Sequence, residues 1–230
     1  MSTDITLVFS KDGSHTLLKT SLNETYHSRN GALQESIHVY IKNGLLVFKE
    51  LEKVVVLEVG FGTGLNALLT WNKAEELKLK VEYHTLEPFP IESEITAQLN
   101  YPSLLEVEEP RSAKRFKHLH DAVWEEEVVL SEYFTIYKYK YTLEEKIFPP
   151  NTFNVCYFDA FAPNHQEDVW REENFKKVYD SLVEGGILTT YCAQSVFKRA
   201  LRAVGFNVEA LEGPKWKKEM TWGRKVLSSK

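Results

Sequence analysis

Three features are scarce in this sequence of 230 residues, and each scarcity excludes a class of protein. Only two cysteines occur, Cys156 and Cys192, and both fall within apolar stretches, so we expect buried thiols rather than a disulfide. No C-x-x-C or H-x-x-x-H cluster is present, so we predict no metal site. No apolar run reaches the ~18 residues of a membrane span, and the first residues lack a secretion signal. We therefore expect a cytoplasmic protein with no membrane partner.

The composition supports a sizeable core and an uneven charge distribution. Apolar residues make up 43% of the chain, which fits one large α/β domain with a small appendage. The formal net charge is −5, yet residues 214–230 hold six basic residues and one acid, and residues 111–118 form a second basic cluster. These basic clusters predict a polyanionic partner on one face, or else an ordinary solvated surface.

A glycine-rich stretch dominates the sequence. Residues 54–57 are four apolar residues typical of a strand buried on both faces, and Glu58 and Val59 follow them. Three glycines at alternate positions then lead into a helical pattern. A dinucleotide fingerprint needs Gly or Ala where Leu65 stands. The pattern favours S-adenosylmethionine (SAM) over a nicotinamide, a flavin or a structural turn, and the predicted cofactor contacts are Glu58, Gly60, Gly62 and Gly64.

Periodicity predicts strands that alternate with helices along the whole chain. We expect a hairpin at residues 5–9 and 15–19, a helix at 32–41 and a helical insertion at 101–132. The expected strands are 54–59, 81–86, 134–139, 155–158, 187–191, 206–211 and 219–226, and the other helices are 65–78, 91–99, 169–182 and 194–204. This order predicts a mostly parallel, doubly wound α/β sheet. We expect residues 1–50 to be an N-terminal extension packed on a domain at 51–230.

Two acids lie where expected strands end, which is where ligands bind in such sheets. Glu87 ends the second strand, so its carboxylate can accept bonds from ribose hydroxyls, or it can cap the next helix. Asp159 ends the fourth strand, beside the place of a transferable methyl group. A carboxylate there can orient an amine and take its proton, or it can cap the next segment. Phe161 and Pro163 would form a stiff wall beside it.

These residues also carry a resemblance to a known family. Asp159-Ala-Phe-Ala-Pro163, with Asp168-Val-Trp170 downstream, resembles the D-G-F-A-P…D-x-W signature of the tRNA 5-aminomethyl-2-thiouridine methyltransferases, known as the methyltransferase half of MnmC or as stand-alone MnmD. Glu58-Val-Gly-Phe-Gly-Thr-Gly-Leu-Asn66 resembles its E-x-G-F-G-T-G-L-N, and residues 87–90 resemble E-K-F-P. Glu35-Ser36…His38-Val39 and residues 191–193, 199–206 and 213–220 resemble further family segments, so the resemblance covers about residues 23–225.

The resemblance implies a Rossmann-like class I methyltransferase that transfers methyl from SAM to the amine of 5-aminomethyl(-2-thio)uridine at the tRNA wobble position. Asp159 would be the catalytic residue, and Phe61, Thr63, Asn66 and Pro88 would join the cofactor contacts. Since the chain ends at Lys230, we expect the family's oxidoreductase half to be absent and a separate enzyme to supply the aminomethyl group.

Departures from the family pattern leave some contacts open. Ala160 replaces a glycine, and Lys138-Tyr139-Lys140 stands where many members carry an adenine-binding acid, so Thr142 or Glu144 is expected to serve instead. An anticodon loop would need stacking surfaces and phosphate contacts. The candidates for stacking are Tyr26, His27, Trp216 and Trp222, and for phosphates Lys215, Lys217, Lys218, Arg224 and Lys225, with core or ordinary surface as the alternative for each aromatic.

Two other functions fit the same motifs. An aminopropyltransferase resembling spermidine synthases would share the glycine loop and the strand-end acid, but the apolar residues after Asp159 argue against a polyamine site. A tRNA-binding module with a vestigial SAM pocket is disfavoured because the glycines and the acids Glu58, Glu87 and Asp159 are all intact.

Overall fold

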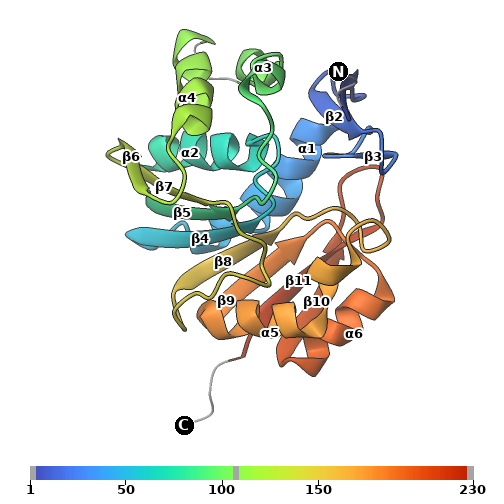
Figure 1. Cartoon of the computed structure of the whole chain (residues 1–230). Coiled ribbons are helices and arrows are strands. Elements are labelled where there is room, and N and C mark those ends of the chain that lie inside the picture. Colours follow the sequence, from blue (N-terminus) through green and yellow to red (C-terminus); the bar gives the residue numbers. More distant parts are fainter. Residues whose placement is uncertain (1–3, 106–108, 227–230) are drawn as a thin grey trace.

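The computed structural model describes residues 4–105 and 109–226, so Lys230, counted above with the basic C-terminus, lies outside it. The described chain contains an eight-stranded sheet of order β10–β11–β9–β8–β4–β5–β7–β6 (Figure 1). Its strands are β4 (Lys53–Val59), β5 (Lys80–Leu86), β6 (Glu127–Ser131), β7 (Phe134–Tyr139), β8 (Phe153–Phe158), β9 (Leu182–Thr190), β10 (Phe206–Glu212) and β11 (Glu219–Lys225). The five central strands are parallel and the outer pairings antiparallel, which confirms the predicted doubly wound sheet.

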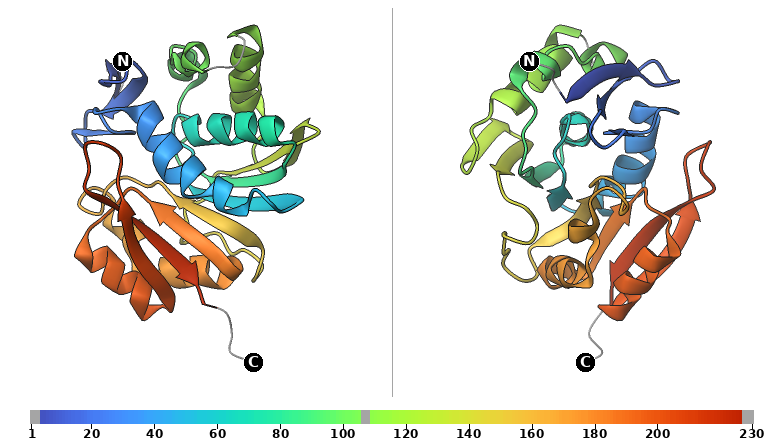
Figure 2. Two further views of the ribbon diagram at one scale, coloured as in Figure 1. Left: turned by 180° about the vertical axis from the view of Figure 1, so that it is seen from behind. Right: turned by 45° about the vertical axis from the view of Figure 1, so that its right-hand side comes forward.

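Alternate residues of the central strand β4 pack into two separate hydrophobic cores, one on each face of the sheet. Val54 and Val56 pack in a core with α2 (Leu65–Leu77). Leu57 and Val59 pack in the other, with α5 (Glu172–Ser181) and α6 (Ser195–Ala203). Figures 1 and 2 show these helices on opposite faces of the sheet. Because the strand is covered on both faces, its sequence is apolar at nearly every position rather than alternating.

The N-terminal residues pack onto the first of these cores. The predicted hairpin is confirmed as β1 (Ile5–Phe9) and β2 (His15–Lys19), and β3 (Glu24–Thr25) adds a third strand. The predicted helix begins as α1 (Ala32–Ser36), continues as a π-helix, η1 (Ile37–Lys42), and is followed by the short η2 (Leu45–Phe48). Val39 and Tyr40 are buried in the same core as the strand residues. The division of the chain at residue 50 stays a prediction.

The predicted helical insertion at residues 101–132 is only partly correct. The short η3 (Tyr101–Leu104) and α4 (Glu109–Asp121) are helical, but residues 127–131 form strand β6, which pairs antiparallel with β7. Val128 and Leu130 alternate toward the core there, a period-2 signal that the preceding acidic run obscured. Residues 106–108 lie outside the described chain.

Two further helices are shorter than predicted. The segment expected at 91–99 is a single helical turn, α3 (Ser93–Thr96), after which Asn100 bonds the carbonyl of Gly13 in the hairpin. The helix expected at 169–182 splits into η4 (Glu167–Trp170) and α5. Strand β9 begins earlier than the expected 187–191, and it includes Gly185 and Gly186 where its register against β8 shifts. In the described residues no helix is long and apolar enough to cross a membrane.

The strand register positions the functional segments side by side. Val59, the last residue of β4, pairs with Leu86 of β5 on one side and Phe158 of β8 on the other. The residues that follow these three are Gly60, Glu87 and Asp159, so all three leave the same edge of the sheet. The connections from β4 diverge here, which is where doubly wound sheets form a ligand crevice.

Candidate active site

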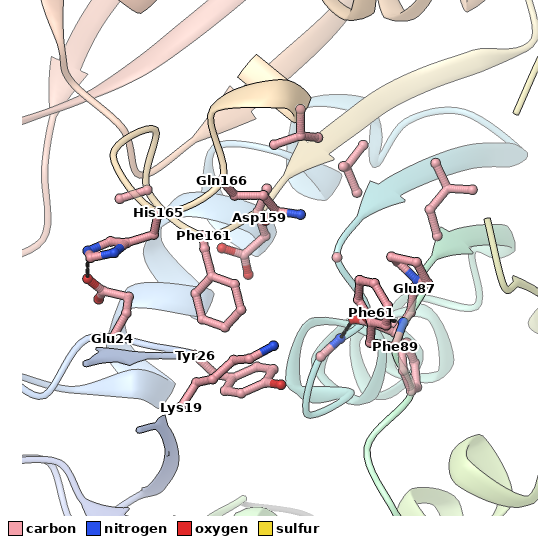
Figure 3. Close-up of a pocket in the computed structure, with 18 of the residues that line it drawn as sticks. Lys19, Glu24, Tyr26, Phe61, Glu87, Phe89, Asp159, Phe161, His165 and Gln166 are labelled. Carbon is pink, nitrogen blue, oxygen red and sulfur yellow. Dashed lines mark hydrogen bonds and ion pairs between the residues drawn. The ribbon is translucent and has the colours of Figure 1, made fainter. Parts of the chain in front are cut away.

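A cavity of about 790 Å³ opens at this edge of the sheet (Figure 3). One part of its wall is formed by the glycine loop (residues 60–64), the end of β5 and the loop after β8. The N-terminal extension closes it from the other side, where Lys19 and Tyr26 face Phe161 and Asp159. Tyr26 contacts Phe161 edge-on, with ring centroids 4.9 Å apart. The cavity is thus shared between the sheet and the first 35 residues.

Gly60 allows the loop to pass directly beside the end of β8. Its φ is +97°, in the region that favours glycine, and a Cβ there would lie 2.6 Å from the carbonyl oxygen of Asp159. Gly62 is also left-handed, and a Cβ there would meet the Tyr26 ring at 3.1 Å. The absence of side chains keeps the loop backbone accessible to a ligand.

Glu87 lies beside the glycine loop, and each of its carboxylate oxygens already accepts one hydrogen bond. The backbone N–H of Gly62 donates to Oε2 at 2.9 Å, and that of Phe89 donates to Oε1 at 3.0 Å. A carboxylate offers about four acceptor positions, so each oxygen can accept one more hydrogen bond from a ligand hydroxyl. Burial raises the pKa of the Glu87 carboxyl against the opposing effect of the two N–H donors.

Asp159 is held by two donors from different elements. The Tyr40 hydroxyl donates to Oδ1 at 2.6 Å, and the Asn66 side-chain amide donates to Oδ2 at 2.7 Å. The same Asn66 nitrogen donates to Oε1 of Glu58 at 3.1 Å, which fixes the orientation of the amide. Thr85 donates to the other Glu58 oxygen at 2.7 Å. The cavity carboxylate therefore rests on a buried polar network.

The electrostatics of this network suit a proton acceptor near neutral pH. Burial raises the pKa of Asp159 to about 6, and the bonds from Tyr40 and Asn66 keep it from rising further. Burial raises the pKa of Glu58 to about 8, aided by the nearby Asp159. At pH 7 to 8, Asp159 is thus an ionised carboxylate, whereas the neighbouring Glu58 is still at least half protonated.

The predicted cofactor residues divide into a lining group and a supporting group. Gly60, Phe61, Gly62, Glu87 and Pro88 line the cavity. Behind its wall lie the fully or almost fully buried Glu58, Thr63, Gly64 and Asn66. Thr63 anchors the loop by hydrogen bonds with His27 and Tyr101.

The predicted substrate residues are divided in the same way. Asp159 and Phe161 line the cavity, whereas Pro163 lies outside its wall. Lys217 lines it, and Lys215 and Lys218 are exposed on either side of Lys217.

The remaining basic and aromatic candidates do not face the cavity as a group. Arg224 lies near the end of β11 that is farther from the cavity edge, where it pairs with Ile187 of β9, and the Lys225 ammonium donates to the carbonyl of Leu182 at 2.7 Å. Trp222 is buried and donates to the carbonyl of Asn43, so the core alternative applies to it.

Two aromatic candidates act as loop supports. Trp216 packs against Gly31, in the N-terminal extension. His27 lines the cavity, but its Nε2 bonds the Thr63 hydroxyl at 2.8 Å, and burial lowers its pKa to about 4. Of the four aromatic candidates, Tyr26 is the one that lines the cavity directly beside Phe161.

The departure at Lys138 has a structural reason. Its ammonium is turned away from the cavity and donates to the carbonyls of Leu119 and His120 at 2.9 and 3.0 Å, over the ring of Trp124. It therefore caps the C-terminus of α4, where a cation is favourable. Thr142 and Glu144 do line the cavity, as expected for alternatives to an acid at this strand end.

Several lining residues escaped the sequence analysis as site residues. Tyr40 lies in the helix expected at residues 32–41, and no local signal indicates that its hydroxyl reaches Asp159. Glu35 lines the cavity, as does Tyr191, whose hydroxyl donates to the carbonyl of Ala160 at 2.9 Å. Glu24 and Glu35 also correct the expectation of apolar surroundings for Asp159, which holds for residues 160–163 but not for the whole cavity. Within the described residues, no group of three or more potential metal ligands is found.

Comparison with known proteins finds similarity to methyltransferases. Residues 132–226 match the family described as S-adenosyl-L-methionine-dependent methyltransferase. The bifunctional tRNA 5-methylaminomethyl-2-thiouridine biosynthesis protein MnmC of Actinobacillus pleuropneumoniae is 27% identical over 245 residues, covering 95% of this chain. The Marinomonas MnmC is 27% identical over 216 residues, covering 87%. The chain is therefore similar to SAM-dependent methyltransferases and to part of the bifunctional MnmC proteins. It spans 35% and 31% of the lengths of these two relatives.

Solved structures agree on the fold. MNMC2 from Aquifex aeolicus superposes with a TM-score of 0.79 at 21% identity, covering 98% of this chain and 73% of that one. Spermidine synthase from Thermotoga maritima superposes with a TM-score of 0.56 at 14% identity, covering 97% and 70%. The chain therefore has the Rossmann-like fold of class I SAM-dependent methyltransferases, and SAM is its cofactor.

Proposed function

We propose that this chain transfers the methyl group of SAM to the primary amine of 5-aminomethyl(-2-thio)uridine at the wobble position of tRNA. The observation that carries the proposal is the position of Asp159. Its carboxylate faces the same cavity as the glycine loop and Glu87, and its pKa of about 6 makes it a base at neutral pH. The similarity to MnmC, whose name gives the modified nucleoside, supports the choice of substrate.

The residues present fit SAM. Glu87 retains acceptor positions for two ribose hydroxyls, the loop at Gly60 and Gly62 exposes backbone, and Leu86, Phe61 and Leu143 offer apolar surface. Thr142 and Glu144 are the residues we assign to the adenine. When bound, SAM supplies an electrophilic methyl group on a sulfonium.

The chain's own residues would prepare the amine. The Asp159 carboxylate attracts the substrate ammonium, accepts a proton from its nitrogen and so leaves a lone pair directed at the methyl group. Tyr40 and Asn66 hold the carboxylate in place, so little reorganisation is needed during transfer. Phe161, with Tyr26 edge-on beside it, provides a wall against which the uracil ring can stack.

The tRNA would approach from the open side of the cavity. Its anticodon loop carries phosphates that Lys217 can reach from inside, and exposed Lys215 and Lys218 from outside. Arg224 stays a weaker candidate because it lies toward the far end of β11. A separate enzyme would supply the aminomethyl group, and a tRNA substrate implies a cytoplasmic location.

The proposal is tested by incubating the chain with SAM and tRNA that carries 5-aminomethyluridine, followed by nucleoside mass spectrometry. We expect the wobble nucleoside to gain one methyl group. Asp159→Asn should lower the rate by about 10²–10⁴-fold, the usual range for a general base, with binding of S-adenosylhomocysteine retained. Binding of SAM without any tRNA methylation would refute the substrate assignment.

A parallel reaction addresses the aminopropyltransferase alternative. Decarboxylated SAM and a polyamine replace the two substrates, and the products are separated by chromatography. We expect no aminopropyl transfer. Polyamine turnover that exceeds tRNA methylation would replace the proposed activity by the alternative one.

A further inference from the structure

Glu35 is an acid that the proposed transfer does not use, and it faces the same cavity as Asp159. It lies on α1, and its exposed fraction is 9%. The backbone N–H of Ser28 donates to its Oε1 at 3.2 Å. Among the described residues this is the single hydrogen bond to the carboxylate, and no basic group lies within 4.0 Å of it.

Burial of the Glu35 carboxylate with one hydrogen bond is energetically unfavourable unless a ligand supplies further partners. A buried carboxylate normally has an ion partner or several hydrogen bonds, because desolvation disfavours its charge. The nearby Asp159 adds like-charge repulsion, and together these effects raise the pKa of Glu35 to about 7. Lys217 acts on Glu35 only through its charge, since its ammonium lies over the Tyr191 ring, 4.8 Å from the centroid.

The Glu35 carboxylate restricts the kind of ligand group that can bind it. An ionised carboxylate only accepts hydrogen bonds, and the other acids that face this part of the cavity, Asp159 and Glu24, add negative charge. A cationic donor satisfies both conditions, whereas a neutral hydroxyl leaves the charge uncompensated. We propose that the Glu35 carboxylate binds a primary ammonium group in this cavity.

Two sources offer this group, given the proposed function on which the inference rests. One is the α-ammonium at the amino-acid end of SAM, and the other is the aminomethyl group of the substrate uridine. In the first case Glu35 orients the cofactor, and in the second it shares the incoming amine with Asp159. Neither role requires Glu35 to take part in the methyl transfer itself.

Calorimetry with two ligands separates the sources. S-adenosylhomocysteine carries the amino-acid end, and 5′-methylthioadenosine is the same nucleoside thioether without it. If Glu35 binds the cofactor ammonium, Glu35→Gln weakens S-adenosylhomocysteine about ten- to a hundredfold, the usual loss for a hydrogen bond to a charged group, and leaves methylthioadenosine unchanged. If it binds the substrate, both affinities persist and the KM for aminomethyl-tRNA rises by a similar factor.

Other outcomes overturn the proposal. Equal weakening of both ligands assigns Glu35 a structural role, and no change in either affinity or in the KM removes it from binding altogether. Glu50→Gln, at a side chain that is 88% exposed, is the matched control and should change nothing. Failure of the unaltered chain to bind S-adenosylhomocysteine contradicts the proposed function instead.

Folding of the variant is checked by its melting temperature, which should not fall because the change removes a poorly paired buried charge. Glu35→Asp is the second variant, in which the charge is kept but its reach is shortened. It should weaken the same ligand as Glu35→Gln while sparing methylthioadenosine. An equal loss for both ligands in this variant also overturns the proposal.

Discussion

The hydrogen bond from Tyr40 to Asp159 sets the pKa of the proposed base, and its removal should move that pKa upward. Tyr40→Phe deletes the donor, 2.6 Å from Oδ1, and keeps the ring that packs against Tyr157 with centroids 5.3 Å apart. A hydrogen bond to a charged group contributes about 1.5–3 kcal/mol, and one pKa unit corresponds to about 1.4 kcal/mol. The pKa of Asp159 should therefore rise from about 6 to roughly 7–8.

The assay is a carbon-13 NMR titration of the chain labelled at its aspartate carboxyls. The sequence has six aspartates, so the carboxyl signals can be resolved, and Asp159→Asn assigns the relevant one. Tyr157→Phe is the matched control, because that hydroxyl contacts Thr70 at 3.4 Å and not Asp159. It should leave the midpoint near 6.

Two results would refute this reasoning. A midpoint for Tyr40→Phe equal to that of the unaltered chain would mean that the hydroxyl does not stabilise the carboxylate. An equal shift in the Tyr157→Phe control would mean that the effect comes from general repacking of the aromatic pair.

Three further predictions concern the loop and its supports. Gly60→Ala should cost about 1–3 kcal/mol of stability and abolish S-adenosylhomocysteine binding in calorimetry. Gly185→Ala is the control, since Gly185 is also left-handed but lies in open space, and this variant should be less destabilised and bind normally. Equal losses of stability and binding in the two variants would contradict the close approach of Gly60 to the Asp159 carbonyl. Glu58 keeps its proton up to about pH 8 when folded but loses it near 4.5 when unfolded, so stability should fall as pH rises through this window. Melting curves should show that Glu58→Gln flattens this slope, which is at most ~1.4 kcal/mol per pH unit; an unchanged slope would exclude Glu58 as its source. Glu87→Gln should weaken S-adenosylhomocysteine about tenfold, and unchanged affinity would remove Glu87 from ribose binding.

Sequence reasoning predicted the sheet well because β4, β5, β7 and β8 are continuous or alternating apolar runs bounded by clear turns. It also placed Gly60, Glu87 and Asp159 at one edge, since the carboxyl ends of parallel strands meet there. It failed at β6, where an acidic run masked a short edge strand whose pairing depends on β7. Edge strands have weak local signals because tertiary pairing decides them.

The same limit applies to the cavity. Tyr40 and Glu35 come from the N-terminal extension, more than 100 residues from Asp159 in the chain, and nothing in their local pattern indicates the contact. Lys138 is the opposite case. It stands near the position where the resemblance leads one to expect an acid, and only the structure shows that its ammonium caps the C-terminus of α4. Long-range packing, not local propensity, decides which side chains complete the site.

The most direct test of the central claim is a single-turnover measurement with methyl-labelled SAM and aminomethyl-tRNA, comparing the unaltered chain with Asp159→Asn. We predict label on the wobble nucleoside for the unaltered chain, and a loss of about 10²–10⁴-fold for the variant with S-adenosylhomocysteine affinity preserved. Label transfer at the same rate in both proteins would contradict the assignment of Asp159 as the base.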